Sequence, residues 1–121
     1  MSKKTTPQAD RLKRRSDFLR LRDSGRKWVS GTVIIQAGDG QGSGIRYGLT
    51  ATKKLGNAVT RNRIKRRLRE AVRAVLRDAR REQAEKNADI VLIGRSAALD
   101  CDFAVLVKDI GWCLRKLEIV T

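Results

Sequence analysis

A basic segment with helical apolar spacing constrains the fold of this chain more than any other feature. From Lys53 to Glu70 the sequence reads KKLGNAVTRNRIKRRLRE, and eight basic residues precede the first acidic one. Beyond its first turns, apolar residues recur at i, i+4, i+8, i+11 and i+12, namely at Ile64, Leu68, Val72, Val75 and Leu76. This spacing predicts an amphipathic α-helix that buries one stripe and ends near Lys86 or Asn87.

The cations of this helix do not favour its stability. A helix N-terminus carries partial positive charge, so each cation there costs about 0.3–1 kcal/mol. Arg61, Lys65 and Arg69 also repel one another at i, i+4 spacing, by about 0.2–0.5 kcal/mol per pair. The buried stripe can offset these costs, because each buried Leu, Ile or Val contributes about 1.5–3 kcal/mol. The charges therefore indicate a phosphate-binding surface, with a merely solvated helix face as the alternative.

The composition favours a binding protein over an enzyme. The 121 residues include 28 Lys and Arg against 13 Asp and Glu, a net charge of +15, and no His. Such a charge indicates nucleic acid or an anionic surface as the partner. Without His the chain lacks the commonest general base and zinc ligand, and its carboxylates are scattered. We therefore expect no catalytic residue and no metal site, and we expect Cys101 and Cys113 to be free thiols.

The length suits one domain. We expect this domain over residues 11–121, preceded by a disordered basic segment at residues 1–10. No apolar run is long enough to span a membrane, and the opening MSKKTTPQAD is not followed by an apolar signal region. These features predict a cytoplasmic protein.

The remaining segments predict an α+β fold in the order helix, strand, strand, helix, strand, helix. Ser16 or Asp17 is expected to cap a short helix that ends at Gly25. Strands are predicted at 31–37 and 45–52, joined as a hairpin through the loop 38–44, and a further short strand near 26–32 is an option. The continuous apolar run at 88–95 predicts a strand covered on both sides.

Two of the predicted elements show which side they bury. The segment 45–52 alternates, which places Ile45, Tyr47, Leu49 and Ala51 on one face of its strand. Asp100 or Asp102 is expected to cap the last helix. The predicted buried stripe of that helix comprises Phe103, Leu106, Val107, Ile110, Leu114 and Leu117, and Trp112 lies just off it.

The aromatic residues in basic surroundings allow two interpretations. Eight cations lie between Arg11 and Lys27, so Phe18 is either a core residue or a face on which a nucleobase stacks. Composition alone favours the core for Phe18 and does not decide for Trp28. The few aromatic residues argue against a sheet that stacks many bases, and composition does not separate DNA from RNA as the partner.

A long contiguous motif resembles a known family. The segment YGLTATKKLGNAVTRNRIKRRLREAVR closely resembles the characteristic segment of the bacterial ribonuclease P protein component. It contains the Thr-x-Thr-Lys-Lys end of a strand, then Gly-Asn-Ala-Val, then an Arg-Asn-Arg helix. The flanking RLKRRSDFLRLRDSGRK and ADIVLIGRSAA resemble the first helix and the last strand of that family, so the resemblance covers roughly residues 10–118.

The resemblance implies a fold and an activity. The implied fold is a single-domain α/β sandwich of helix, strands, helix, strand and helix, with a left-handed β-α-β crossover around the basic helix, although the physical default is right-handed. The implied function is that of the RNA-binding protein subunit of ribonuclease P. In that enzyme a catalytic RNA, using Mg²⁺, removes the 5′ leader from precursor tRNA. The implied partners are the ribonuclease P RNA and precursor tRNA, with no obligate protein partner.

The resemblance also implies two RNA-binding surfaces. One faces the RNA subunit and comprises Asn57, Arg61, Asn62, Arg63, Lys65, Arg66 and Arg69. The other binds the single-stranded leader in a cleft and comprises Phe18, Arg22, Gln36, Thr50, Thr52, Lys53 and Lys54. Arg22 and Gln36 stand where relatives can have aromatic residues, so base stacking in this cleft is expected to be thinner. A ribosomal-protein-like RNA-binding module and a DNA-binding protein or self-sufficient nuclease are the alternatives.

Overall fold

The computed structural model describes residues 12, 14–40, 44–81 and 87–120. The segment 1–10, predicted to be disordered, lies outside the described residues. The helices are α1 (Arg15–Asp23), α2 (Ala58–Arg81) and α3 (Phe103–Lys116), with short 3-10 helices η2 (Lys53–Leu55) and η3 (Ser96–Ala98). The strands are β1 (Arg26–Val29), β2 (Val33–Asp39), β3 (Ile45–Thr50) and β4 (Ala88–Gly94). The α+β class and the order of the elements are as predicted, and β1 is the optional short strand.

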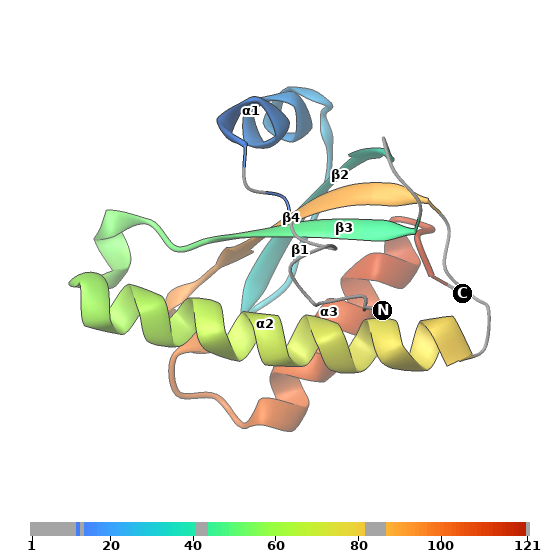
Figure 1. Cartoon of the computed structure of the whole chain (residues 1–121). Coiled ribbons are helices and arrows are strands. Elements are labelled where there is room, and N and C mark those ends of the chain that lie inside the picture. The colour runs from blue at the N-terminus through green and yellow to red at the C-terminus, as the bar shows by residue number, and fades with distance from the viewer. Residues whose placement is uncertain (1–11, 13, 41–43, 82–86, 121) are drawn as a thin grey trace, which may run out of the picture.

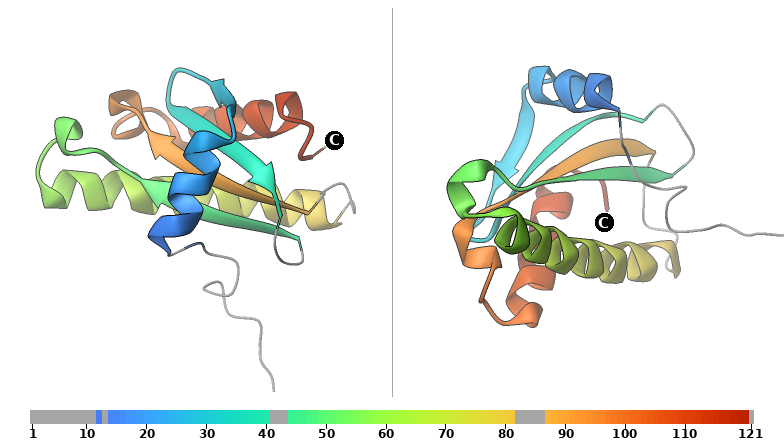
Figure 2. Two further views of the ribbon diagram at one scale, coloured as in Figure 1. Left: turned by 90° about the horizontal axis from the view of Figure 1, so that it is seen from above. Right: turned by 60° about the vertical axis from the view of Figure 1, so that its left-hand side comes forward.

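The elements form three layers around one mixed sheet. The strand order is β1-β2-β4-β3, in which β4 pairs antiparallel with β2 and parallel with β3. Helix α1 lies on one face of the sheet, while α2 and α3 cover the other face (Figures 1 and 2). The sheet is thus fully covered on one face and only partly covered on the other, which leaves room beside α1.

The predicted hairpin between residues 31–37 and 45–52 is wrong, because β4 lies between β2 and β3. Strand β4 is buried along nearly its whole length, and a strand apolar on both faces belongs in the middle of a covered sheet. The parallel pair β3–β4 then needs a long connection, and α2 provides it. The left-handedness of this crossover stays a prediction.

The larger core lies between the sheet and the helices α2 and α3. The predicted strand face of Ile45, Tyr47, Leu49 and Ala51 is buried there, as are Ile64, Leu68, Val72 and Leu76 of α2, with Val75 partly buried. Helix α3 buries Leu106, Ile110 and Leu114, and Leu117 just beyond it, as predicted. Phe103 is an exception: it is exposed, because it stands in the first turn of α3, at the edge of the packed surface.

The predicted cap of α1 at Ser16 or Asp17 is wrong, whereas Asp102, one of the two residues predicted to cap the last helix, does stand at the N-cap position of α3. Residue Arg14 precedes α1, and it makes no side-chain cap hydrogen bond, while Asp17 lies within the first turn. Asp102 does precede α3, also without a side-chain cap hydrogen bond. The start of α1 therefore needs another source of stability, and its contacts with the sheet provide one.

Those contacts centre on a buried carboxylate, Asp89, on the central strand β4. Its Oδ2 accepts hydrogen bonds from Arg20 of α1 at 2.6 Å and from Arg46 of β3 at 2.7 Å, and its Oδ1 accepts one from Arg46 at 2.9 Å. Arg20 also donates to Asp17 at 3.1 Å. Burial acts to raise the pKa of Asp89, but the hydrogen bonds and charges of Arg46 and Arg20 outweigh it and lower that pKa. Asp89 therefore ties α1 and β3 to the middle of the sheet.

We predict that Asp89→Asn lowers the free energy of unfolding by about 2 kcal/mol at neutral pH. This is less than the roughly 3–5 kcal/mol of a fully buried broken pair, because both guanidiniums still reach solvent. A carboxyl with a lowered pKa stabilises the fold above its unfolded pKa of about 3.9 and loses this contribution as pH falls through its folded pKa. Urea unfolding of both proteins between neutral and acidic pH measures the effect, and the difference between them should shrink below about pH 4.

The exposed Asp23 at the end of α1 provides the matched control. It lies 3.5 Å from Arg22, and both side chains are mostly in solvent, so Asp23→Asn should leave stability nearly unchanged. If the free energy of unfolding depended on pH in the same way in Asp89→Asn, in Asp23→Asn and in the unchanged protein, Asp89 would not anchor α1.

Candidate nucleic-acid interface

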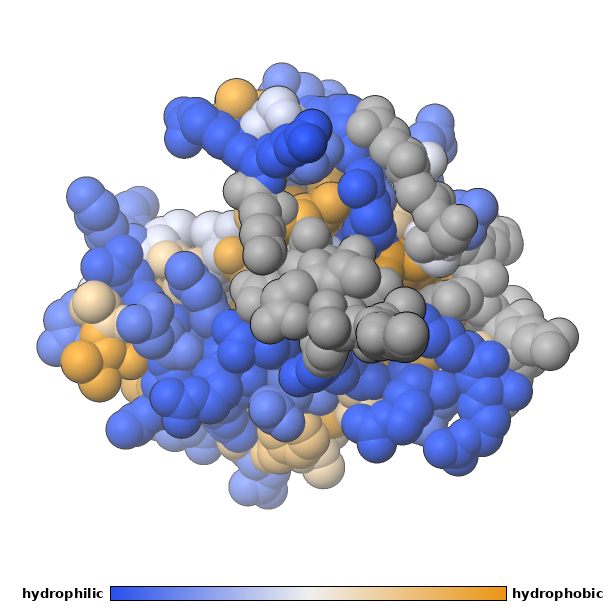
Figure 3. Space-filling view, viewed as in Figure 1, coloured by the Kyte–Doolittle hydropathy of each residue, from blue (hydrophilic) through white to orange (hydrophobic). Residues whose placement is uncertain are grey.

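A cleft of about 450 Å³ opens between α1 and the uncovered part of the sheet. In the space-filling view, hydrophobic residues show in the hollow beneath the hydrophilic α1 (Figure 3). The apolar lining includes Val91 and Ile93 of β4, and α1 contributes the cations Arg15 and Arg22. The cleft is lined by Arg15, Phe18, Leu19, Arg22, Gln36, Thr50, Val91 and Ile93. An apolar floor beside guanidinium groups suits a nucleobase and its phosphate.

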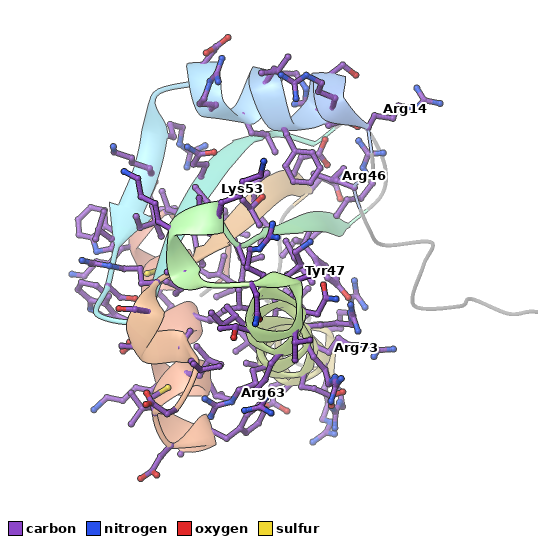
Figure 4. All side chains as sticks on the ribbon, turned by 90° about the vertical axis from the view of Figure 1, so that its left-hand side faces the viewer. Arg14, Arg46, Tyr47, Lys53, Arg63 and Arg73 are labelled. Carbon is purple, nitrogen blue, oxygen red and sulfur yellow. The ribbon has the colours of Figure 1, made fainter. Side chains whose placement is uncertain are left out.

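The cleft brings together four of the seven residues predicted to bind the leader, namely Phe18, Arg22, Gln36 and Thr50. The other three, Thr52, Lys53 and Lys54, follow the end of β3 and are exposed. Lys53 lies on the turn that leads from β3 into α2 (Figure 4). This turn lies outside the cleft lining and connects it in sequence to the start of the basic helix.

Phe18 is half-buried and takes part in both alternatives that the sequence left open. Its ring packs against the small cluster of Leu12, Leu21 and Val91, and it also lines the cleft. The ring rests on Gly48 of β3: a Cβ at Gly48 would lie only 2.6 and 2.8 Å from two of its carbons. The absence of a side chain at Gly48 therefore sets how deep Phe18 sits, and this contact was missed from the sequence.

The start of α2 is capped and carries no acidic residue. Asn57 caps it, since its Oδ1 accepts a hydrogen bond from the backbone N–H of Thr60 at 3.0 Å. Gly56 has φ 134°, a conformation that favours glycine. The first turn contains no acidic residue, so no side chain of the helix itself offsets its positive end. An external anion is therefore favoured there.

The residues of α2 that were predicted to bind the RNA subunit divide by depth. Asn62, Arg63 and Arg66 are exposed, whereas Arg61, Lys65 and Arg69 are half-buried. The Nε atoms of Arg61 and Arg69 are buried, and neither has a hydrogen-bond partner among the described residues. The exposed residues, Arg63 and Arg66 among them, are therefore the donors of α2 that a bound molecule can reach directly.

The basic surface continues beyond the predicted residues. Arg73 and Arg77 lie seven and eleven positions after Arg66 in α2, so helical geometry places them on nearly the same side. Arg73 extends to the side of α2 opposite α3, while Arg63 extends away from the sheet (Figure 4). The same spacing rule that identified the apolar stripe would have found them.

Arg67 has a different role from its neighbours. Its Nη1 donates to the backbone carbonyl of Ala98 at 2.6 Å, and its Nη2 donates to the carbonyl of Cys101. It thus holds the connection between β4 and α3 against α2. One of the eight cations in the basic segment is therefore structural, and charge alone could not single it out.

The arrangement suits binding of a polyanion. Among the described residues, no three Cys, Asp or Glu side chains gather as a metal site would require. No helix in the described parts of the chain is long and apolar enough to cross a membrane. The cleft beside α1 and the cationic side of α2 are the two candidate surfaces, because both combine cations with accessible space or exposure.

Comparisons with known proteins agree with this geometry. The family model described as Ribonuclease P matches residues 6–118. The ribonuclease P protein component of Gluconacetobacter diazotrophicus is 47% identical over 110 residues, 90% of this chain and 91% of that protein. That of Paramagnetospirillum magneticum is 41% identical over 113 residues, 89% and 82% of the two chains.

Solved structures show the same fold. The RNase P protein of Staphylococcus aureus has a TM-score of 0.74 at 26% identity, covering 93% of this chain and 98% of that chain. The RNase P protein from Thermotoga maritima has a TM-score of 0.69 at 26% identity, covering 89% and 94%. With the family match and the identity to curated relatives, these similarities lead to one conclusion: the chain belongs to the ribonuclease P protein component family.

Proposed function

We propose that this chain is the RNA-binding subunit of a ribonuclease P that removes the 5′ leader from precursor tRNA. Its cationic α2 surface binds the catalytic RNA subunit through Asn57, Arg61, Asn62, Arg63, Lys65, Arg66 and Arg69. Its cleft beside α1 binds the single-stranded leader through Phe18, Arg22, Gln36 and Thr50, with Thr52, Lys53 and Lys54 on the adjoining turn. The protein contributes binding and positioning, and the RNA subunit contributes catalysis.

The observation that carries this proposal is the set of basic residues along α2, of which Arg63 and Arg66 are fully exposed. Arg61, Lys65 and Arg69 are half-buried and follow one another at one-turn spacing along the same helix. RNA phosphates also lie in a regular row, and they accept charge-assisted hydrogen bonds from such side chains. The net charge of +15 favours such a partner at long range.

The proposal assigns Mg²⁺ to the RNA subunit. The chain's own contribution, in this proposal, is to bind and position the two RNAs. The active particle is one RNA with this protein, acting in the cytoplasm without an obligate protein partner.

Reconstitution tests the proposal. The protein, the ribonuclease P RNA of its cell and labelled precursor tRNA are mixed at low Mg²⁺, where protein assistance is needed most. We expect the protein to stimulate 5′ cleavage and to have no activity alone. Absence of stimulation would refute the proposal, and cleavage by the protein alone would favour a self-sufficient nuclease.

We predict that Arg63→Ala and Arg66→Ala weaken binding of the RNA subunit while leaving the fold intact. Both side chains are exposed, and each lost phosphate contact should reduce the slope of log affinity against log salt by about 1. Filter binding across a salt series measures affinity and slope together. Thermal unfolding of the same variants should be nearly unchanged.

Arg67→Ala is the matched control within the same helix. Arg67 is bound to the carbonyls of Ala98 and Cys101, so its loss should destabilise the fold by about 1–3 kcal/mol. It should change the salt slope little. If Arg63→Ala or Arg66→Ala behaved like Arg67→Ala, the cations of α2 would be structural.

We predict that Gly48→Ala impairs leader binding through Phe18. The strand conformation of Gly48 accepts Ala, but the new Cβ would displace the Phe18 ring toward the cleft. Because stacking of a base on an aromatic ring is worth about 1–3 kcal/mol, the affinity for precursor tRNA should fall about fivefold or more. The affinity for mature tRNA should change little. Phe18→Ala should have the same selective effect.

Gly38→Ala serves as the control for overpacking of α1. A Cβ there would lie 2.7 Å from Cδ2 of Leu21, so it disturbs the packing of α1 through Leu21 and does not press directly on the Phe18 ring. It should lower the free energy of unfolding by about 1–3 kcal/mol. The ratio of the affinities for precursor and mature tRNA should change less than in Gly48→Ala. Equal losses for precursor and mature tRNA in Gly48→Ala and Phe18→Ala would assign Phe18 to the core alone.

A further inference from the structure

The only two tryptophans of the chain form one exposed pair. Trp28 of β1 and Trp112 of α3 have ring centroids 5.8 Å apart and an interplanar angle of 74°, an edge-to-face arrangement. Trp28 is 37% exposed and Trp112 is 39% exposed. Each indole therefore buries most of its surface and still leaves more than a third of it in solvent.

The pair lies apart from the two surfaces described above. Trp28 is the cross-strand partner of Ile35, whose side chain is in the core beneath α2 and α3. Gln36, the residue after Ile35 on β2, lines the cleft. Its side chain therefore points to the face of the sheet opposite to that of Ile35 and Trp28. The sheet thus separates Trp28 from the leader cleft, and neither tryptophan belongs to α2.

Cations lie beside the pair on α3. Lys108 and Lys116 lie four residues before and after Trp112, so both stand one turn away on the same side of α3. Both lysines are exposed, as is Arg115 next to Lys116. Asp109 lies three residues before Trp112, and its carboxylate accepts a hydrogen bond from Oγ1 of Thr32 at 2.7 Å. The three cations outnumber this carboxylate, so the net charge beside Trp112 is positive.

A purely structural role explains only part of this arrangement. The pair seals the seam between β1 and α3, where Sγ of the buried Cys113 lies 3.9 Å from the carbonyl of Trp28. Sealing accounts for the buried part of each indole, whereas the exposed part remains without a partner among the described residues. Association of two copies through this surface would bring like charges together in a protein of net charge +15.

We propose that Trp28, Trp112, Lys108 and Lys116 form a third RNA-binding surface, which takes an unpaired nucleotide. The base stacks on an exposed indole face, and the flanking phosphates lie between the two lysines. Alternation of an aromatic residue with cations is how proteins bind single-stranded nucleic acid without reading its sequence. This site goes beyond the proposed function, since neither the RNA-subunit surface nor the leader cleft includes it.

Intrinsic fluorescence reports on this surface directly, because the chain has no other tryptophan. The full-length protein is titrated with a short single-stranded oligoadenylate while indole emission is followed and total binding is measured by filter retention. We expect saturable quenching that weakens with added salt, and no quenching by double-stranded RNA of equal length. The quenching should persist in Phe18→Ala, which removes stacking in the leader cleft.

Paired charge variants make the test specific. Lys108→Glu with Lys116→Glu should weaken the binding that causes quenching about fivefold or more, whereas Lys108→Arg with Lys116→Arg should preserve it. Filter-detected binding without quenching would overturn the proposal, because the RNA would then bind elsewhere. An emission change that depends on protein concentration alone would also overturn it, in favour of self-association.

Failure of this inference can be told apart from failure of the proposed function. Stimulation of tRNA cleavage together with absent quenching would remove only the third surface. Quenching without stimulation of cleavage would leave the tryptophan surface in place and remove the ribonuclease P assignment of function.

Discussion

The position of α1 depends on one buried carboxylate. Asp89 sits on the central strand and receives hydrogen bonds from guanidinium groups of α1 and β3. The apolar contact beneath α1 is small: among the residues that the structure describes, its buried members are Leu12, Leu21 and Val91. In a chain of net charge +15, a helix rich in arginine would otherwise be repelled by its surroundings. Asp89 binds one cation of α1, Arg20, and one of β3, Arg46, and so attaches a basic helix to the sheet.

The open cleft follows from how α1 is attached. Arg20 holds the helix from the side that faces Asp89, while Arg15, Leu19 and Arg22 occupy the side that lines the cleft. Glycines then let the helix lie close to the strands: Gly38 accommodates Leu21, and Gly48 accommodates Phe18. Because α1 is held at one side and packs closely against glycines of the strands, the part of the same sheet face beside it stays uncovered. The apolar residues at the base of the cleft, Val91 and Ile93, thus stay accessible while α1 remains attached to the sheet.

Periodicity predicted the features of this fold that depend on one segment at a time. The buried stripe of α2, the alternating face of β3 and the burial of β4 on both sides were all predicted. Each depends only on the spacing of apolar residues within its own segment. The order of the strands was not, since glycines in the loop after β2 signal a turn but not which strand comes next in the sheet. Phe103 was wrongly predicted to be buried, and it is exposed. The apolar spacing runs to the first turn of the helix, but the surface against which the helix packs ends before that turn.

The site was predictable to a similar degree. The resemblance grouped Phe18, Arg22, Gln36 and Thr50, and the structure brings these four residues into one cleft. Contacts between distant segments were not predicted. No local pattern links Asp89 to Arg20, or Gly48 to Phe18, because those residues are far apart in the chain. The tryptophan pair escaped for the same reason, since Trp28 and Trp112 meet only once β1 and α3 are packed side by side.

The cations of α2 show why charge has to be read together with contacts. Arg67 is next in sequence to Arg66, yet helical geometry turns it about 100° toward the connection between β4 and α3, where backbone carbonyls receive it. Arg66 is exposed, and the Nε atoms of Arg61 and Arg69 have no acceptor among the described residues. A helix selected for stability alone would not favour cations near its own positive end. The difference between Arg67 and its neighbours therefore separates a cation that holds the fold together from the cations available to the proposed RNA partner.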